Sequence, residues 1–150
     1  MKRHPALQPL SDDHHAALVL ARQLRLAAER SPGRAELTPI WDDLRQRFAR
    51  ELEPHFRVEE ERLFPQLAAA GEPALAEQAR SDHARLRELV HGEANAQAAA
   101  EFAQRLHRHV RFEERELFPR AEAVLPLAIL EAAGRAALLS RPPGADPARA

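Results

Sequence analysis

The chain contains no cysteine among its 150 residues. This absence excludes disulfide bonds, thiolate metal ligands and cysteine nucleophiles. The chain also has no tyrosine, which excludes phenol or tyrosyl-radical chemistry. Among the side chains that commonly bind metals, histidines and carboxylates therefore remain as candidates.

The chain also lacks a strong charge and a long hydrophobic run. Its net charge is −1 at pH 7, which gives no argument for binding to nucleic acid or to an anionic membrane. The most apolar stretch, residues 124–139, is interrupted by Pro126, Glu131 and Arg135 and is not expected to span a membrane. The first residues lack the apolar run of a signal peptide. We therefore expect a cytoplasmic protein with one domain, large enough for its own core.

The hydrophobic pattern predicts helices and no strands, because apolar residues recur at steps of three and four. It predicts four long helices, over about residues 11–30, 38–70, 73–91 and 95–118, and a shorter fifth helix over residues 126–139. Ser11 and Thr38 are the expected N-caps of the first two helices, and Pro54 is expected to kink the second.

Long amphipathic helices with short loops are typical of an antiparallel up-down four-helix bundle. We therefore predict an all-α fold with the bundle over residues 11–125, preceded by an extended lead-in over residues 1–10. Residues 126–139 are expected to form an accessory helix on the outside of the bundle. The composition of residues 140–150 predicts a disordered tail.

One sequence pattern occurs twice, over residues 55–65 and 109–119. The two copies read H-F-R-V-E-E-E-R-L-F-P and H-V-R-F-E-E-R-E-L-F-P, so both have the form H-x-x-x-E-E-x-x-L-F-P. An Asp-His pair precedes each copy, at residues 13–14 and 82–83. The chain therefore contains two halves in which the same residue types follow in the same order.

Six polar residues fall on the apolar stripes of the predicted helices, where core residues are expected. They are His14, His55, Glu59, His83, His109 and Glu113. Each of the four long helices contributes one histidine, and the second and fourth add a glutamate one turn later. Buried imidazoles and carboxylates are costly unless they are paired or bind a metal. The six side chains are therefore expected to share one buried metal site.

Three neighbouring residues are alternatives to this set. His15 follows His14, but it fits the apolar stripe of its helix less well. Glu60 and Glu114 lie about 100° away from the stripe, which favours a position that supports the ligands or contacts solvent. His15 remains an alternative or additional ligand, and Glu60 and Glu114 remain alternative carboxylate ligands.

The composition of this set restricts the metal. Four imidazoles and two carboxylates are too many ligands for one tetrahedral Zn²⁺, and Ca²⁺ and Mg²⁺ prefer oxygen ligands. The mixture suits iron, manganese or zinc. If each glutamate bridges two metals, each metal receives two imidazole nitrogens and two carboxylate oxygens. Positions then remain for solvent, an oxo or hydroxo bridge and an external ligand, which suits O₂ or a related small diatomic molecule.

The repeated pattern with its preceding Asp-His pairs resembles the hemerythrin-like (HHE cation-binding) domains over about residues 10–120. The resemblance implies a non-haem di-iron centre in a four-helix bundle. It implies that the four histidines are terminal ligands and that Glu59 and Glu113 bridge the two iron ions. In the oxygen-carrying hemerythrins a further histidine follows one turn after the histidine of the third helix. Here that position is Arg87, which we expect to point outward.

The resemblance predicts a protein that binds or senses O₂, NO or iron. Two alternatives follow from the same residues. One is a di-iron redox enzyme that turns over peroxide, O₂ or NO, which the missing ligand at Arg87 favours. The other is a metal-binding protein with a mainly structural or storage role. The expected partner is a small diatomic ligand or peroxide.

Overall fold

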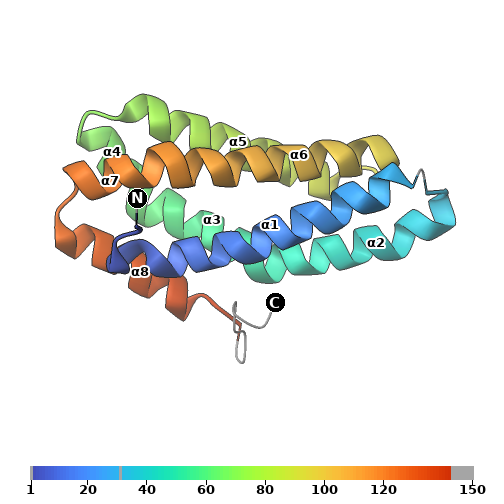
Figure 1. The fold of residues 1–150 in the computed structure, drawn as a ribbon, viewed down its shortest axis with the longest axis horizontal. Coiled ribbons are helices and arrows are strands. Elements are labelled where there is room, and N and C mark those ends of the chain that lie inside the picture. Colours follow the sequence, from blue (N-terminus) through green and yellow to red (C-terminus); the bar gives the residue numbers. More distant parts are fainter. Residues whose placement is uncertain (1, 31, 143–150) are drawn as a thin grey trace.

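The structure is a computed structural model that describes residues 2–30 and 32–142. Four long helical segments lie side by side in it (Figure 1). They are α1 (Gln8–Glu29), the run from α2 (Arg34–Arg47) to α4 (Phe64–Ala69), α5 (Pro73–His91), and the run from α6 (Ala96–Phe112) to α7 (Phe118–Val124). Helix α1 packs along α6, and α5 packs against α2, α4 and α6. The described residues contain no strand, and the predicted all-α four-helix bundle is confirmed.

The first helix begins earlier than the sequence predicted. Ser11, the predicted N-cap, lies inside α1, which starts at Gln8. The reason is a preceding 3₁₀ turn, η1 (Pro5–Leu7), which leads directly into the helix. The imidazole of His4 caps this turn, because its Nδ1 accepts a hydrogen bond of 3.0 Å from the N–H of Ala6. The predicted extended lead-in is therefore helical in its last residues.

The second helix also begins earlier, after Gly33, with Thr38 and Pro39 inside α2. The hydroxyl of Thr38 donates a hydrogen bond of 3.0 Å to the carbonyl of Arg34, one turn back. Threonine hydroxyls satisfy carbonyls within a helix in this way. The prediction of Thr38 as N-cap was therefore wrong.

The long second and fourth segments each contain wide π-helical turns. These are η2 (Phe48–Leu52), η3 (Glu59–Leu63) and η4 (Glu113–Leu117), and α3 (Glu53–Val58) lies between the first two. Each wide turn ends two residues before a proline, which cannot donate a backbone hydrogen bond. The residue before each proline donates its N–H to the carbonyl five residues back rather than four. The repeated L-F-P therefore places a π turn at both glutamates of the pattern, and the irregularity expected at Pro54 takes the same form.

The apolar core consists of two clusters, and the polar residues lie between them. Along α1, Leu10 belongs to one cluster and Ala17 to the other, with His14 between the two. His83 has the same intermediate position on α5. The six polar side chains therefore form a layer across the middle of an otherwise apolar core.

Helix α8 (Leu127–Leu139) packs against η1, α1 and η3 on the outside of the bundle. It approaches η1 so closely that a Cβ atom on Gly134 would lie 2.0 Å from the carbonyl oxygen of Ala6. Glycine is therefore required at this crossing. The predicted disordered tail, residues 140–150, lies outside the described residues from residue 143 onward.

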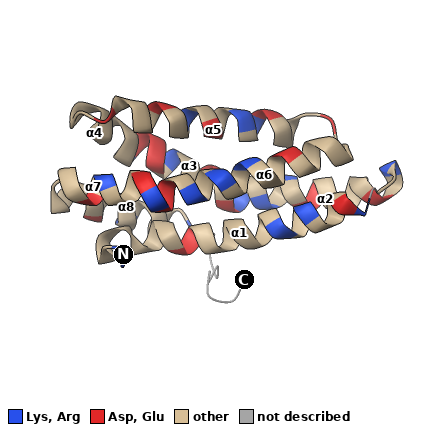
Figure 2. Cartoon of the chain, turned by 45° about the horizontal axis from the view of Figure 1, so that its top comes forward, with Lys and Arg blue, Asp and Glu red and all other residues tan. Residues whose placement is uncertain are grey.

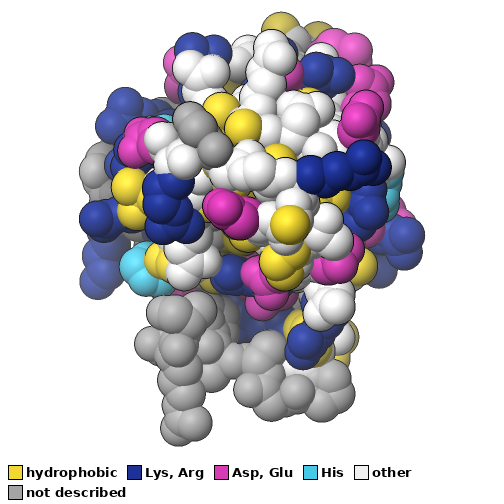
Figure 3. All heavy atoms as spheres, turned by 90° about the vertical axis from the view of Figure 1, so that its right-hand side faces the viewer, with side chains coloured by type: hydrophobic (Ala, Val, Ile, Leu, Met, Phe, Trp, Pro, Cys, Tyr) yellow, Lys and Arg dark blue, Asp and Glu magenta, His cyan; other side chains and the backbone are white. Residues whose placement is uncertain are grey.

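Acidic and basic residues are interspersed along the helices (Figure 2). At the end of the bundle that includes the turn between α1 and α2, hydrophobic side chains are scattered among charged ones (Figure 3). None of the described helices combines the length and the apolar character needed to cross a membrane.

Candidate metal centre

The six predicted residues meet in the middle of the bundle. Their side chains come from α1 (His14), α3 (His55), η3 (Glu59), α5 (His83), α6 (His109) and η4 (Glu113). Their exposed fractions lie between 0% and 4%, so all six are buried. His15, in contrast, is exposed. The predicted phase of the first helix, with His14 rather than His15 facing inward, is confirmed.

The six side chains form two groups that share both glutamates. His14 and His55 complete one group, and His83 and His109 complete the other. Within each group, the possible ligand atoms lie within 4.8 Å of one another. The Nε2 atoms of His14 and His55 are 3.2 Å apart, and those of His83 and His109 are 3.1 Å apart. Each group could hold one metal ion.

The two glutamates lie between the groups. Oε1 of Glu59 is 3.2 Å from Nε2 of His55 and 3.3 Å from Nε2 of His83. Oε1 of Glu113 is 3.0 Å from Nε2 of His14 and 2.9 Å from Nε2 of His109. Each carboxylate therefore faces one histidine from each group.

The glutamate oxygens provide a test of whether these residues fit a metal. Both oxygens of Glu59 and Oε2 of Glu113 are buried and have no hydrogen-bond partner. A buried carboxylate oxygen without a partner costs on the order of 1–3 kcal/mol or more. A metal cation held within a group would satisfy these oxygens, so the residues fit a bound metal.

Each histidine is hydrogen-bonded through its other ring nitrogen to a further carboxylate. The distances from Nδ1 are 2.9 Å for His14 to Glu114, 3.0 Å for His55 to Asp13, 2.7 Å for His83 to Glu60, and 3.1 Å for His109 to Asp82. When Nδ1–H donates to a carboxylate, Nε2 is unprotonated, and its lone pair is available on the opposite side of the ring. Metal-binding histidines have this arrangement, which fixes the tautomer and the orientation of the ring. All four imidazoles are therefore oriented as metal ligands.

These contacts explain why the Asp-His and Glu-Glu pairs recur. The aspartate of each half contacts the histidine of the repeated pattern in the same half. The second glutamate of each pattern contacts the histidine of the Asp-His pair in the other half. Glu60 and Glu114 therefore have the supporting position that the sequence favoured. The roles of Asp13 and Asp82 were not predicted, although their repeated place directly before a histidine was a visible signal.

The aromatic residues of the repeated pattern pack on the imidazoles. The ring of Phe118 stacks on His14, with 5.2 Å between centroids and an interplanar angle of 7°. The ring of Phe64 lies 5.5 Å from that of His83, and Phe56 stacks on His83 at 3.8 Å. All three phenylalanines are buried. They restrict the rings and keep water from the polar layer.

Arg87 does not point outward as the sequence suggested. Its guanidinium donates hydrogen bonds of 2.9 and 3.0 Å to Glu60 and further ones to Glu53, and its side chain is 28% exposed. It lies over the ring of Phe56, at 5.7 Å from the centroid. Burial by itself raises the pKa of Glu60, but hydrogen bonds from His83 and Arg87 lower it to about 2. Arg87 therefore supports the carboxylate that orients His83.

Without a metal, the neighbouring carboxylates favour the protonated form of three imidazoles in the polar layer. Burial by itself lowers the pKa of His109, but the charge of Glu113 and the hydrogen bond to Asp82 raise it to about 10. Burial lowers the pKa of His55 and His14 too, and their carboxylate neighbours raise both above the usual value. Burial raises the pKa of Glu113, whereas His109 brings it well below its usual range. Because metal ligands must be deprotonated, a bound cation would take the place of these protons.

Residues 6–121 match the protein family described as the hemerythrin HHE cation binding domain. The match includes all six buried polar residues and the four carboxylates that contact the histidines, and it ends before α8. No match was found among curated proteins or among solved structures. The chain belongs to the hemerythrin HHE cation-binding domain family.

Proposed function

We propose that the protein binds two non-haem iron ions, one in each of the two groups, with Glu59 and Glu113 shared between them. The observation that supports this proposal is the pair of buried glutamates whose free oxygens lie between two histidine pairs. The mixture of imidazole and carboxylate suits iron, with manganese or zinc as alternatives. The two carboxylates offset the repulsion between two cations held close together.

Binding or sensing of O₂, NO or iron is the function that this centre supports best. Bound iron would supply redox chemistry and open coordination positions, since each group offers four ligand residues. The chain itself fixes the four imidazoles through their carboxylates and excludes water with the buried phenylalanines. A small diatomic molecule or peroxide is the ligand that such an enclosed layer admits.

The test of this proposal is the metal content of the aerobically purified protein together with its optical spectrum, recorded before and after addition of peroxide. About two iron ions per chain and a spectrum that responds to peroxide are expected. Bound metal with no response to O₂, NO or peroxide would indicate the structural or storage role instead. Protein that takes up no metal would contradict the proposal.

Turnover of peroxide, O₂ or NO is a second candidate function. The observation that favours it concerns Arg87. Its guanidinium donates hydrogen bonds to Glu53 and Glu60, and the side chain adds no ligand to the His83 group. Open metal positions favour chemistry over simple binding. We therefore expect iron-loaded, reduced protein to oxidise irreversibly within minutes of exposure to air, as followed by its absorption spectrum. A spectrum that is stable in air and fully reversed on removal of O₂ would contradict turnover and indicate reversible oxygen carriage.

Replacing His14 by alanine should reduce the bound iron, whereas replacing His15 should not. His14 is buried, and its Nε2 lies 3.0 Å from Glu113, while the adjacent His15 is exposed. The two variants are a matched pair because they remove the same side chain from neighbouring positions. The measurement is iron per chain after identical loading. Loss of iron from His15→Ala with retention in His14→Ala would contradict the proposed ligand.

A further inference from the structure

Three of the four carboxylates that orient the histidines are themselves paired with an arginine. Glu60 pairs with Arg87, Glu114 with Arg3, and Asp13 with Arg141. The fourth, Asp82, has a side chain that is 30% exposed, and no arginine among residues 2–30 and 32–142 pairs with it. The arginines therefore support some histidines and not others.

Arg3 contacts the two residues that hold the ring of His14, Glu114 and Phe118. Its Nη2 donates a hydrogen bond of 2.7 Å to the main-chain carbonyl of Glu114 and lies 3.6 Å from Oε1 of that residue. Its Nη1 donates to Glu122 at 2.9 Å, and its side chain is only 11% exposed. The guanidinium also lies over the ring of Phe118, at 5.3 Å, and this ring stacks on His14. Arg3 therefore fixes the carboxylate and the aromatic ring that orient one imidazole.

Arg141 makes the equivalent connection to His55. Its Nε donates a hydrogen bond of 3.1 Å to Oδ1 of Asp13, whose Oδ2 lies 3.0 Å from Nδ1 of His55. Its Nη2 donates to the carbonyl of Pro9 at 2.9 Å. Arg141 and Asp13 are each 19% exposed in their side chains. The ion pair is therefore largely shielded from solvent, where such pairs are screened less than at the surface.

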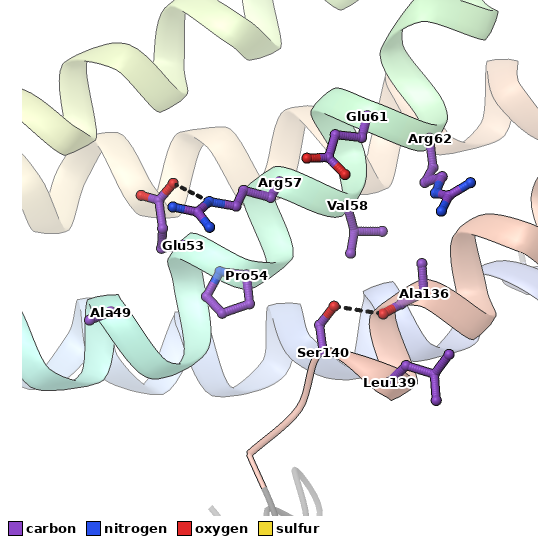
Figure 4. A pocket seen from close by; sticks show the side chains of 10 residues that line it. All are labelled: Ala49, Glu53, Pro54, Arg57, Val58, Glu61, Arg62, Ala136, Leu139 and Ser140. Carbon is purple, nitrogen blue, oxygen red and sulfur yellow. Dashed lines mark hydrogen bonds and ion pairs between the residues drawn. The ribbon is translucent and has the colours of Figure 1, made fainter.

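Helix α8 determines where Arg141 lies. The hydroxyl of Ser140 donates a hydrogen bond of 2.7 Å to the carbonyl of Ala136 at the end of this helix, directly before Arg141. A groove of about 700 Å³ lies between this end of α8 and the surfaces of α3 and η3 (Figure 4). The close crossing of Gly134 over Ala6 fixes the helix at its middle. The position of Arg141 therefore depends on the packing of the whole accessory helix.

Arg3 and Arg141 support histidines of the same group. His14 and His55 are the two histidines of one group, whereas Arg87 supports His83 in the other. Arg3 and Arg141 both lie outside residues 6–121, the range that matches the family. The segments that precede and follow the bundle in the sequence thus converge on one of the two proposed metal positions. A residue of the bundle itself, Arg87, supports the other.

We propose that Arg3 and Arg141 are positioning residues that set the metal affinity of the His14–His55 position, and that Arg87 has this role for the His83–His109 position. This inference rests on the proposed binding of two metal ions. The guanidinium is a rigid, planar fork that fixes the geometry of a carboxylate. Removal of a group that hydrogen-bonds a metal ligand typically costs about 10–100-fold in metal affinity, and the arginines act through such carboxylates, one contact further from the metal. The flanking segments thereby make the two positions unequal.

The test compares Arg3→Ala, Arg141→Ala and Arg87→Ala in the full chain, loaded with Fe²⁺ under anaerobic conditions. The measurement is the rate of metal release to an excess of chelator, with metal per chain determined before and after. We expect Arg3→Ala and Arg141→Ala to accelerate one phase of release about 10-fold, the lower end of the range for groups that contact a ligand directly. Arg87→Ala should accelerate the other phase. The variant His14→Ala should lack the phase that Arg141→Ala accelerates, which assigns it to the His14–His55 position.

Arg135→Ala is the matched control, because Arg135 lies exposed on the same helix, α8. Arg141→Lys keeps the charge but not the fork and should have an intermediate rate, even where the alanine variant folds poorly. Equal acceleration of both phases, or rates equal to those of Arg135→Ala, would overturn the positioning role while leaving metal binding intact. Unmodified protein that binds no metal would overturn the proposed function itself.

Discussion

Removal of the bound metal with a chelator should lower the midpoint of thermal unfolding by on the order of 10 °C. The six polar side chains separate the two apolar clusters of the core, and all six are buried. Without a metal, three of the four glutamate oxygens in this layer have no hydrogen-bond partner. A metal that binds only the folded chain offsets this cost.

The size of the shift follows from mass action. A ligand present at about 1,000 times its Kd stabilises the folded state by about 4 kcal/mol. For a protein of this length, each kcal/mol shifts the midpoint by roughly 2–4 °C. The measurement is a pair of thermal melts, with and without chelator, with loss of the metal confirmed by elemental analysis. Equal midpoints in the two melts would show that the metal does not contribute to stability.

The difference between the two melts should also grow with pH. In the metal-free protein the pKa of His109 is raised from 6.5 to about 10. A raised pKa stabilises the fold fully below the unfolded value and loses this contribution as the pH rises through the folded value. The metal-free protein should therefore lose stability between about pH 6.5 and 10. The loaded protein should not, because its imidazoles bind metal in the unprotonated form. Melts at several pH values in this range measure the effect.

The bundle and the six inward residues could be predicted from the sequence because both depend on helical periodicity. A histidine or glutamate on an apolar stripe is visible in a single helix, without knowledge of its neighbours. His14 lies between Leu10 and Ala17 in the sequence as it does in the folded core. The same periodicity placed Glu60 and Glu114 beside the stripe, where they contact the imidazoles of other helices.

The supporting arginines could not be predicted in this way, because their partners are distant in the sequence. Arg141 and Asp13 are separated by 128 positions, and Arg3 and Glu114 by 111. Whether an arginine turns outward or pairs with a carboxylate depends on which helices meet, and periodicity does not contain that information. The outward orientation expected for Arg87 was wrong for this reason.

The early helix starts were missed for a local reason. Ser11 and Thr38 have the side chains of good N-caps, but each follows residues that already form a helical turn. Near the N-terminus, His4 supplies the cap that a serine or aspartate more often provides. Helix boundaries are determined by such competing caps, whereas the interior of a long amphipathic helix is not.

Replacing Glu59 by glutamine should remove metal from both positions, although it changes a single side chain. Oε1 of Glu59 lies within 3.3 Å of one histidine from each group, so both proposed ions depend on it. The amide keeps the shape but loses the negative charge that offsets the repulsion between two neighbouring cations. His14→Ala, in contrast, removes a ligand from only one group and should leave metal at the other.

The expected result is protein without bound metal in Glu59→Gln and partial occupancy in His14→Ala, as measured by metal per chain after identical loading. The control is Glu61→Gln, the same substitution at an exposed position on the same π turn, which should leave both positions filled. If Glu59→Gln retained a full complement of metal, or lost it from one position alone, Glu59 would not be shared and the proposed pair of ions would be wrong.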